Sequence, residues 1–181
     1  IFDNFNLKVE ENQFVSIIGS NGSGKTTLLN LVCGSVVPEE GSVNIAGENI
    51  IAMPEHKRYD FIGRVFQEPG FGTSPSMTLL ENLSMAENKG KKWNLNKLID
   101  KNKISRYREL LAEVGLGLEN KMHDKVGSFS GGQRQAVSLI MATMSDIKFL
   151  ILDEHTAALD PKTADTIMIL TDKIIKEKKL T

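Results

Sequence analysis

The sequence predicts an α/β fold: a mostly parallel sheet flanked by helices, with an antiparallel β edge and an inserted helical subdomain. Three observations lead to this prediction. A glycine-rich loop at 19–26 separates a β-rich run from a helical run. Residues 149–152 form a continuous apolar run, typical of a strand buried on both faces of a parallel sheet. Between about residues 68 and 145, helical periodicity replaces the strand pattern.

The first third of the chain alternates short strand-like runs with turns. Residues 7–9 and 14–18 are β-rich runs joined by a polar turn, and they account for the expected antiparallel edge. Residues 26–32 predict a helix that ends at Gly34, because glycine suits the left-handed conformation common just beyond a helix. Residues 42–46 and 62–66 predict two further strands.

The remainder predicts a helical insertion and a final strand–helix unit. Within the insertion, the lysine-rich segment 89–103 is interpreted as a solvated face or loop. Asp160 and Pro161 predict the start of a helix with one apolar face, through an N-cap followed by proline at the first position. We therefore expect one domain over 1–181, with a catalytic core (1–67 and 146–181) and a helical subdomain (68–145).

Composition restricts the class of protein. The net charge of −1 gives no general reason to expect a nucleic-acid partner. The single cysteine, Cys33, cannot form an internal disulfide, and no apolar run approaches the roughly 20 residues that span a bilayer. We expect a cytoplasmic protein. We also expect the chain to be cut at both ends, because no Met precedes Ile1 and a helix stops at Thr181 where another strand should follow.

The loop at 19–26 matches G-x-x-x-x-G-K-[ST] between a strand and a helix. Its glycines let backbone N–H groups surround phosphate oxygens, and the helix directs its positive end at the same anion. Lys25 supplies a positive charge for the phosphates, and the Thr26 hydroxyl can coordinate Mg²⁺. Alone, this motif identifies a P-loop nucleotide-binding protein without separating kinases, GTPases and motors. The phosphate-binding residues are Gly19, Ser20, Asn21, Gly22, Ser23, Gly24, Lys25, Thr26 and Thr27.

Ser130, Gly131 and Gly132 precede a helix expected to begin near Gln133. Unhindered N–H groups, a hydroxyl and the helix dipole make this a second anion site, although an ordinary Gly-Gly turn is the simpler alternative. Two such sites in one chain can hold one nucleotide from two sides if a second copy of the chain supplies one of them.

Together these motifs resemble those of the ABC ATPase family. Residues 129–133 resemble the ABC signature motif, with Phe129 where Leu is usual, and 149–154 resemble a Walker B strand with its catalytic glutamate. Residues 158–160 resemble the D-loop, and Gln67 resembles the Q-loop glutamine. The four motifs occur in family order over essentially the whole chain.

The resemblance implies a head-to-tail dimer with ATP between the P-loop of one copy and the signature motif of the other. Glu154 would be the general base for the attacking water, and Asp153 would hold Mg²⁺ through water. The implied site residues are Glu154, Gln67 and Lys25 for catalysis; Thr26, Gln67 and Asp153 for Mg²⁺; Ser130, Gly131, Gly132 and Gln133 for ATP bound in trans; and Asp160 in the D-loop.

Some features depart from the family pattern. His155 stands where many members have proline, and we interpret it as a local turn residue. The family's switch histidine and its adenine-stacking aromatic residue are expected outside residues 1–181. Residues 1–181 alone are therefore expected to bind ATP weakly and hydrolyse it poorly.

The motor would drive a membrane transporter through a separate permease. Residues 63–69, 73–78 and 153–160 resemble a bacterial importer subgroup that uses a permease and an extracellular substrate-binding lipoprotein, and that has been linked to amino-acid uptake. The implied location is peripheral, on the inner face of the cell membrane. A twin-domain translation ATPase and an exporter with a fused membrane domain remain alternatives. A chromosome or DNA-repair ATPase is disfavoured, because the insertion has neither a heptad array nor cysteine pairs.

Overall fold

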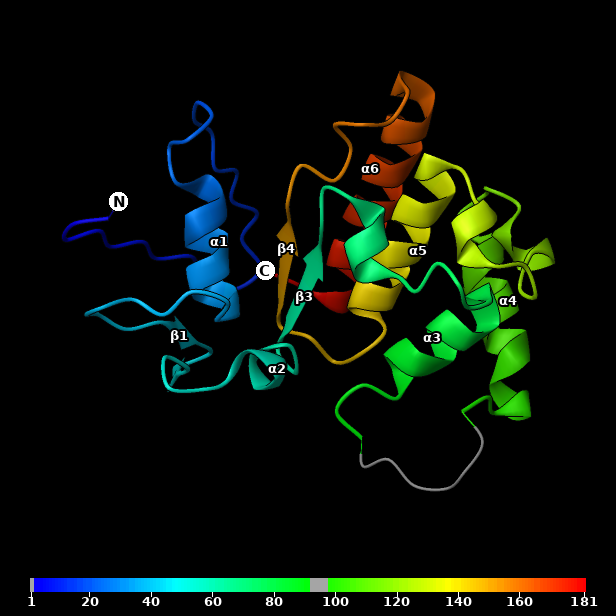
Figure 1. The fold of residues 1–181 in the computed structure, drawn as a ribbon, viewed down its shortest axis with the longest axis horizontal. Coiled ribbons are helices and arrows are strands. Elements are labelled where there is room, and N and C mark those ends of the chain that lie inside the picture. The colour runs from blue at the N-terminus through cyan, green and yellow to red at the C-terminus, as the bar shows by residue number, and fades with distance from the viewer. Residues whose placement is uncertain (1, 92–97) are drawn as a thin grey trace.

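The computed structural model of the chain describes residues 2–91 and 98–181. Figure 1 shows two short strands, β3 and β4, between an N-terminal part with α1 and a larger helical part. The main elements are α1 (Lys25–Cys33), β1 (Asn44–Ile45), β2 (Glu48–Asn49), α2 (Glu55–Arg58), β3 (Ile62–Val65), α3 (Leu79–Glu87), α4 (Ile104–Ala112), α5 (Gly131–Thr143), β4 (Phe149–Leu152) and α6 (Pro161–Lys178). Short 3₁₀ turns lie at Pro69–Gly72, Lys101–Lys103, Leu118–Asn120 and Val126–Ser128.

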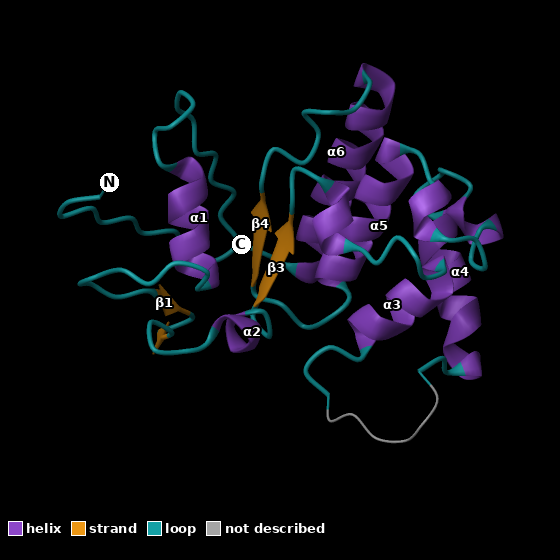
Figure 2. Cartoon of the chain, in the orientation of Figure 1, coloured by secondary structure: helices purple, strands orange, loops and turns teal. Residues whose placement is uncertain are grey.

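The described strands form two pairs (Figure 2). β3 and β4 are parallel, with Ile62 opposite Phe149 and Val65 opposite Leu152. β1 and β2 are antiparallel. The predicted α/β class, with parallel and antiparallel β structure and flanking helices, is confirmed. The strands expected at 62–66 and 149–152 are found within one residue of those bounds.

The strands expected at 7–9 and 14–18 are wrong. Neither run pairs with a described strand, and the antiparallel pair instead lies at 44–49. The side chains of Phe14 and Ile18 are 66% and 92% exposed. A β-rich run becomes a strand only when its backbone finds a partner and one face is buried, and composition supplies neither. The strand expected at 42–46 is reduced to two residues for the same reason.

The helix ends agree well with the sequence signals. Gly34 follows α1 at a φ of 89°, and its N–H donates to the Asn30 carbonyl at 2.9 Å. At the start of α6, Thr163 N donates to the side chain of Asp160 at 3.1 Å. α5 begins two residues before Gln133. The lysine-rich segment 89–103 is only partly described, because residues 92–97 lie outside the described residues.

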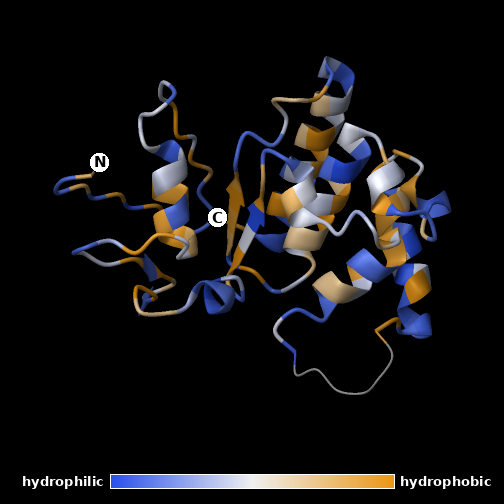
Figure 3. Ribbon diagram, in the orientation of Figure 1, coloured by the Kyte–Doolittle hydropathy of each residue, from blue (hydrophilic) through white to orange (hydrophobic). Residues whose placement is uncertain are grey.

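The strand pair is buried on both faces, as its apolar sequence predicts. Val65 and Leu150 belong to the larger core, which α3, α4, α5 and α6 complete. Ile62 and Ile151 belong to a smaller core beneath α1 and the turn before α2. Figure 3 shows β4 as a continuously hydrophobic strand between the two parts. The alternation of strand side chains thus joins the two cores.

A fully buried arginine fastens the C-terminal end of α1 to this smaller core. The side chain of Arg58 is 1% exposed. Its charge is balanced by carbonyl dipoles, two of them at the negative end of α1. A Cβ atom on Gly34 would lie 2.7 Å from Arg58 Nε, so the glycine also makes room for the guanidinium. Arg58 donates to the carbonyls of Leu31 (2.8 Å), Val32 (3.1 Å), Ile51 (2.9 Å) and Met53 (3.0 Å).

Replacing Arg58 by Met should lower the free energy of unfolding by about 3 kcal/mol, because it removes a buried side chain that donates to four carbonyls. Lys57→Met, one residue earlier on the exposed face of α2, should change it by less than about 0.5 kcal/mol. Urea unfolding of both variants measures the difference. Equal stability of the two would show that Arg58 does not hold α1 in place.

Candidate functional site

The glycine-rich loop curls around the lysine that follows it. Lys25 Nζ donates to the carbonyls of Gly19 at 2.8 Å and Ser20 at 3.1 Å. Gly22 and Gly24 have φ values of 80° and 96°, which few other residues adopt cheaply. Gly24 is the N-cap of α1 and offers no side chain to the first turn. The backbone N–H groups there are available to an anion, as the motif predicts.

The parallel strands bring three predicted site residues to one edge of the sheet. Asp153 follows β4 and its N–H donates to the Val65 carbonyl of β3 at 3.0 Å. Gln67 follows β3 by two residues, and both Gln67 and Glu154 have exposed side chains. Glu154 has a φ of 46°, a left-handed conformation that costs a non-glycine residue free energy and concentrates at functional sites.

Sequence reasoning missed one residue of this site, Arg64. Its Nη2 donates to Asp153 Oδ2 at 3.0 Å, and its Nη1 donates to Asn30 Oδ1 on α1 at 2.8 Å. Burial acts to lower the pKa of Arg64, but the hydrogen bond to Asp153 and the charges of Cys33, Tyr59 and Asp153 together outweigh burial, and the pKa is raised. The available signal was a charged residue in the middle of the strand predicted at 62–66.

The signature segment forms the N-terminal cap of α5. Gln133 N donates to Ser130 Oγ at 3.3 Å, and Ser130 N donates to Gln133 Oε1 at 3.2 Å, which is a capping box. Gln133 Nε2 also donates to the Leu116 carbonyl at 3.1 Å. The Gln133 side chain is therefore used to build the helix start, whereas the hydroxyl proton of Ser130 is not required by the cap.

The starts of α5 and α6 are packed against each other. An added Cβ on Gly132 would lie 2.1 Å from Thr163 Cγ2, whereas one on Gly131 would lie 3.7 Å from Leu159 Cδ2. Asp160, the N-cap of α6, has its pKa lowered by hydrogen bonds from Thr163. The expected signature and D-loop segments are thus neighbours within one chain.

The two segments predicted to bind anions lie on different sides of the strand pair. The N-terminal ends of α1, α5 and α6 and the carboxyl ends of β3 and β4 all lie toward the upper edge of Figure 1. α1 is on one side of β3 and β4, and α5 is on the other. The segments that follow β3 and β4 and the P-loop that precedes α1 therefore lie toward the same end of the molecule, while the signature segment at the start of α5 lies on the other side of the strand pair.

The predicted magnesium ligands have suitable chemistry. A hydroxyl from Thr26, an amide oxygen from Gln67 and a carboxylate from Asp153 are the hard oxygen donors that Mg²⁺ prefers. Within residues 2–91 and 98–181, no group of three or more His, Cys, Asp and Glu could hold a metal by itself. The residues therefore fit an ion that takes its other ligands from phosphate and water.

His155 lies in the turn after β4, as expected, but its side chain is buried. Its Nε2 is 3.4 Å from Thr171 Oγ1 on α6, and burial lowers its pKa. This packing gives His155, which follows Glu154 in the sequence, a structural role.

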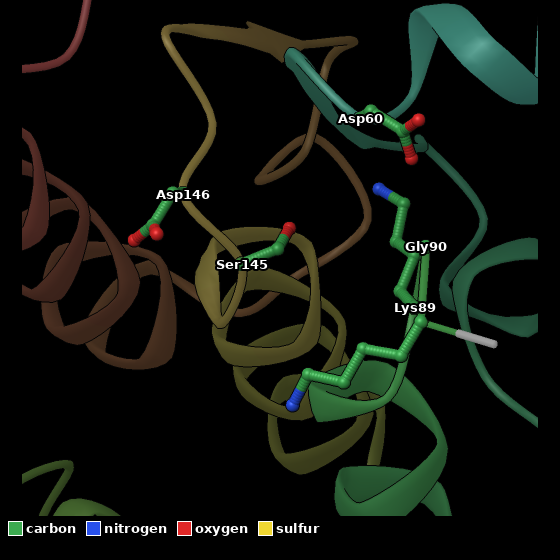
Figure 4. Close-up of a pocket in the computed structure, with 6 residues that line it drawn as sticks. Asp60, Lys89, Gly90, Ser145 and Asp146 are labelled. Carbon is green, nitrogen blue, oxygen red and sulfur yellow. The ribbon is translucent and has the colours of Figure 1, made fainter.

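A pocket of about 250 Å³ lies at the opposite end of the strand pair (Figure 4). Asp60 precedes β3, Ser145 and Asp146 precede β4, and Lys89, Gly90 and Lys91 follow α3. The site residues follow the strands, so this pocket is separate from them. Its acidic and basic side chains balance each other, which leaves no net preference for a charged ligand.

Comparison with known proteins identifies the class of site. A family model described as ABC transporter matches residues 2–157. A tyrosine transport ATP-binding protein of Clostridioides difficile is 48% identical over 181 residues, which cover all of this chain and 72% of that protein. A methionine import ATP-binding protein of Enterococcus faecalis is 36% identical over 178 residues, which cover 97% of this chain and 49% of that protein.

A solved structure gives the same result. A dimeric ATP-binding cassette in a post-hydrolysis state, bound to ADP and Pi, has a TM-score of 0.77 and 32% identity, covering 97% of this chain and 75% of that chain. None of the helices in the described parts of the chain has the length and apolar character needed to cross a membrane.

The contact between Gly132 and Thr163 gives a testable prediction. Gly132→Ala should lower the free energy of unfolding by about 1–3 kcal/mol, because its Cβ overlaps the Thr163 methyl group. Gly131→Ala should stay within about 0.5 kcal/mol, since its Cβ meets only an ordinary contact. Adding Thr163→Ser to Gly132→Ala removes the overlapping methyl and should restore stability. Denaturant unfolding measures all three variants, and a failed rescue would contradict the assigned contact.

Proposed function

We propose that this chain is the motor of a bacterial importer. The chain belongs to the family of ABC transporter ATP-binding domains and is an ATPase of that family. The observation that carries the proposal is the placement of two anion-binding segments on opposite sides of one strand pair. Neither segment alone encloses a nucleotide, and a second copy turned head to tail would supply the missing half.

In this arrangement the P-loop holds the triphosphate of ATP. Lys25 exchanges its present carbonyl partners for phosphate oxygens, and the open first turn of α1 donates N–H groups to the same anion. The residues proposed to bind ATP are Gly19, Ser20, Asn21, Gly22, Ser23, Gly24, Lys25, Thr26 and Thr27, with Ser130, Gly131, Gly132 and Gln133 contributed in trans. Gln133 would act mainly by holding Ser130 in its cap.

Hydrolysis is assigned to the carboxyl edge of β3 and β4. Glu154 accepts a proton from the attacking water, and its left-handed backbone, with a φ of 46°, is a conformation that concentrates at functional sites. Thr26, Gln67 and Asp153 would hold Mg²⁺, which when bound neutralises charge that develops on the phosphates. Asp160 fixes the start of α6 beside the signature segment, where the partner copy would meet it.

We assign the catalytic core to residues 1–67 and 146–181, and the coupling to a permease to the helical subdomain, 68–145. The segment between Gln67 and α3 would contact the permease. Phe71 supports this assignment, because it is 74% exposed directly after the Q-loop. The relatives' names support import, with an amino acid as the cargo. The chain would then be peripheral on the inner face of the membrane, with a substrate-binding lipoprotein outside.

Glu154→Gln should reduce kcat for ATP hydrolysis about 10²- to 10⁴-fold, because it removes the general base. The variant should also accumulate as a dimer when ATP and Mg²⁺ are present, since the closed state can no longer hydrolyse its nucleotide. Gel filtration of the full-length protein measures the dimer. Glu40→Gln, on an exposed loop, is the matched control and should behave as the wild type. A Glu154→Gln variant that stays monomeric in saturating ATP would contradict the assignment.

The transporter itself can be tested by purification from the native cell with mild detergent. The full-length protein should co-purify with a multi-span permease. Phe71→Asp should lose that partner while keeping its affinity for ATP, because it places a charge in the proposed apolar contact. Val37→Asp, at a similarly exposed apolar position, should keep the permease. Ribosomes or DNA-repair proteins without a membrane partner would show that the motor drives a different process.

A further inference from the structure

Arg64 contacts the same carboxylate that the proposed function assigns to Mg²⁺. The guanidinium Nη2 lies 3.0 Å from Asp153 Oδ2, and the Arg64 side chain is 6% exposed. Asp153 is itself partly buried at the end of β4. An ion pair in this setting is screened less by solvent and salt than a pair on the surface. The carboxylate is therefore neutralised from within the protein.

The guanidinium is held by groups from three elements. Nη1 donates to Asn30 Oδ1 on α1 at 2.8 Å, and Cζ lies 4.7 Å from the centre of the Phe66 ring, just after β3. Nε has no hydrogen-bond partner among the described residues, so the two closest polar contacts of Arg64 are those with Asn30 and Asp153. The side chains of Cys33 and Tyr59 also interact with the guanidinium. Arg64 thereby links the helix of the P-loop to the acidic end of β4.

This placement differs from that of Arg58, the other deeply buried arginine of the core. All four hydrogen bonds of Arg58 go to backbone carbonyls, which are permanent partners. One hydrogen bond of Arg64 instead goes to the side chain of Asp153, which is also a proposed ligand of Mg²⁺. A cation attracted to Asp153 meets the positive charge of Arg64 a few ångströms away, and the two compete for one carboxylate.

We infer that Arg64 is a positioning residue: it holds Asp153 as an internal counter-ion and so limits how strongly metal and nucleotide reinforce each other's binding. The inference rests on the proposed role of Asp153 toward Mg²⁺. The relevant quantity is the coupling ratio, defined as the affinity for a non-hydrolysable ATP analogue in excess Mg²⁺ divided by its affinity in EDTA. A charge that competes with the metal lowers this ratio.

The test is equilibrium binding of that analogue to the full-length protein with and without Mg²⁺. Arg64→Met should raise the coupling ratio about three- to tenfold, because Asp153 loses its competing charge. Arg64→Lys, which keeps the charge, should stay within about twofold of the wild type. Arg64→Gln is the second charge-free variant, in case the Met variant does not fold. A purely structural defect would weaken binding equally in Mg²⁺ and EDTA and would leave the ratio unchanged.

Asp153→Asn separates failure of this inference from failure of the proposed site. If Asp153 holds the metal, Asp153→Asn lowers the coupling ratio, and adding Arg64→Met to it changes nothing further. A ratio unaffected by Asp153→Asn would remove the metal role of Asp153 and the inference with it. A ratio lowered by Asp153→Asn but unchanged or lowered by Arg64→Met would leave the proposed site intact and overturn the role of Arg64.

Discussion

The parallel pairing of β3 and β4 is the constraint on which the rest of the structure depends. It joins segments that lie more than 80 residues apart in the sequence, with Ile62 beside Phe149 and Val65 beside Leu152. Because the strands run the same way, the residues that follow each one emerge at the same edge. Gln67 and Asp153 lie at one edge of the strand pair for this reason. The two faces of the pair also connect the core under α1 with the core among the helices.

Two buried arginines secure α1 near its C-terminal end, and they do so with different chemistry. Arg58 binds backbone carbonyls near the C-terminal end of the helix, so its contacts persist whatever ligand the protein carries. Arg64 binds Asn30 and the carboxylate of Asp153 at the proposed catalytic edge, where Mg²⁺ is the proposed competing partner of that carboxylate. The first arrangement favours rigidity. The contacts of Arg64 instead connect α1, the helix of the P-loop, to the carboxylate that is proposed to hold Mg²⁺.

The signature segment combines a structural task with a proposed binding task. Ser130 and Gln133 satisfy each other's backbone groups at the start of α5, which fixes the loop before any nucleotide arrives. Gly132 is required by the close approach of Thr163 from α6, and this packing joins the signature segment to the D-loop. This preformed segment would serve as the proposed second anion site only when another copy presents a nucleotide to it. The geometry of one chain therefore supports the two-chain mechanism.

The sequence by itself determined the features that depend on neighbouring residues: the curled P-loop, the end of α1 at Gly34, the start of α6 at Asp160 and the buried strand at 149–152. Each of these follows from local hydrogen bonds, backbone preferences or an unbroken apolar run. Only the tertiary structure decided which strands pair, because pairing requires partners distant in sequence. That is why the β-rich runs at 7–9 and 14–18 form no paired strand. It also decided that Arg64 meets Asp153, since a charged side chain takes its partner from whatever element the fold places beside it.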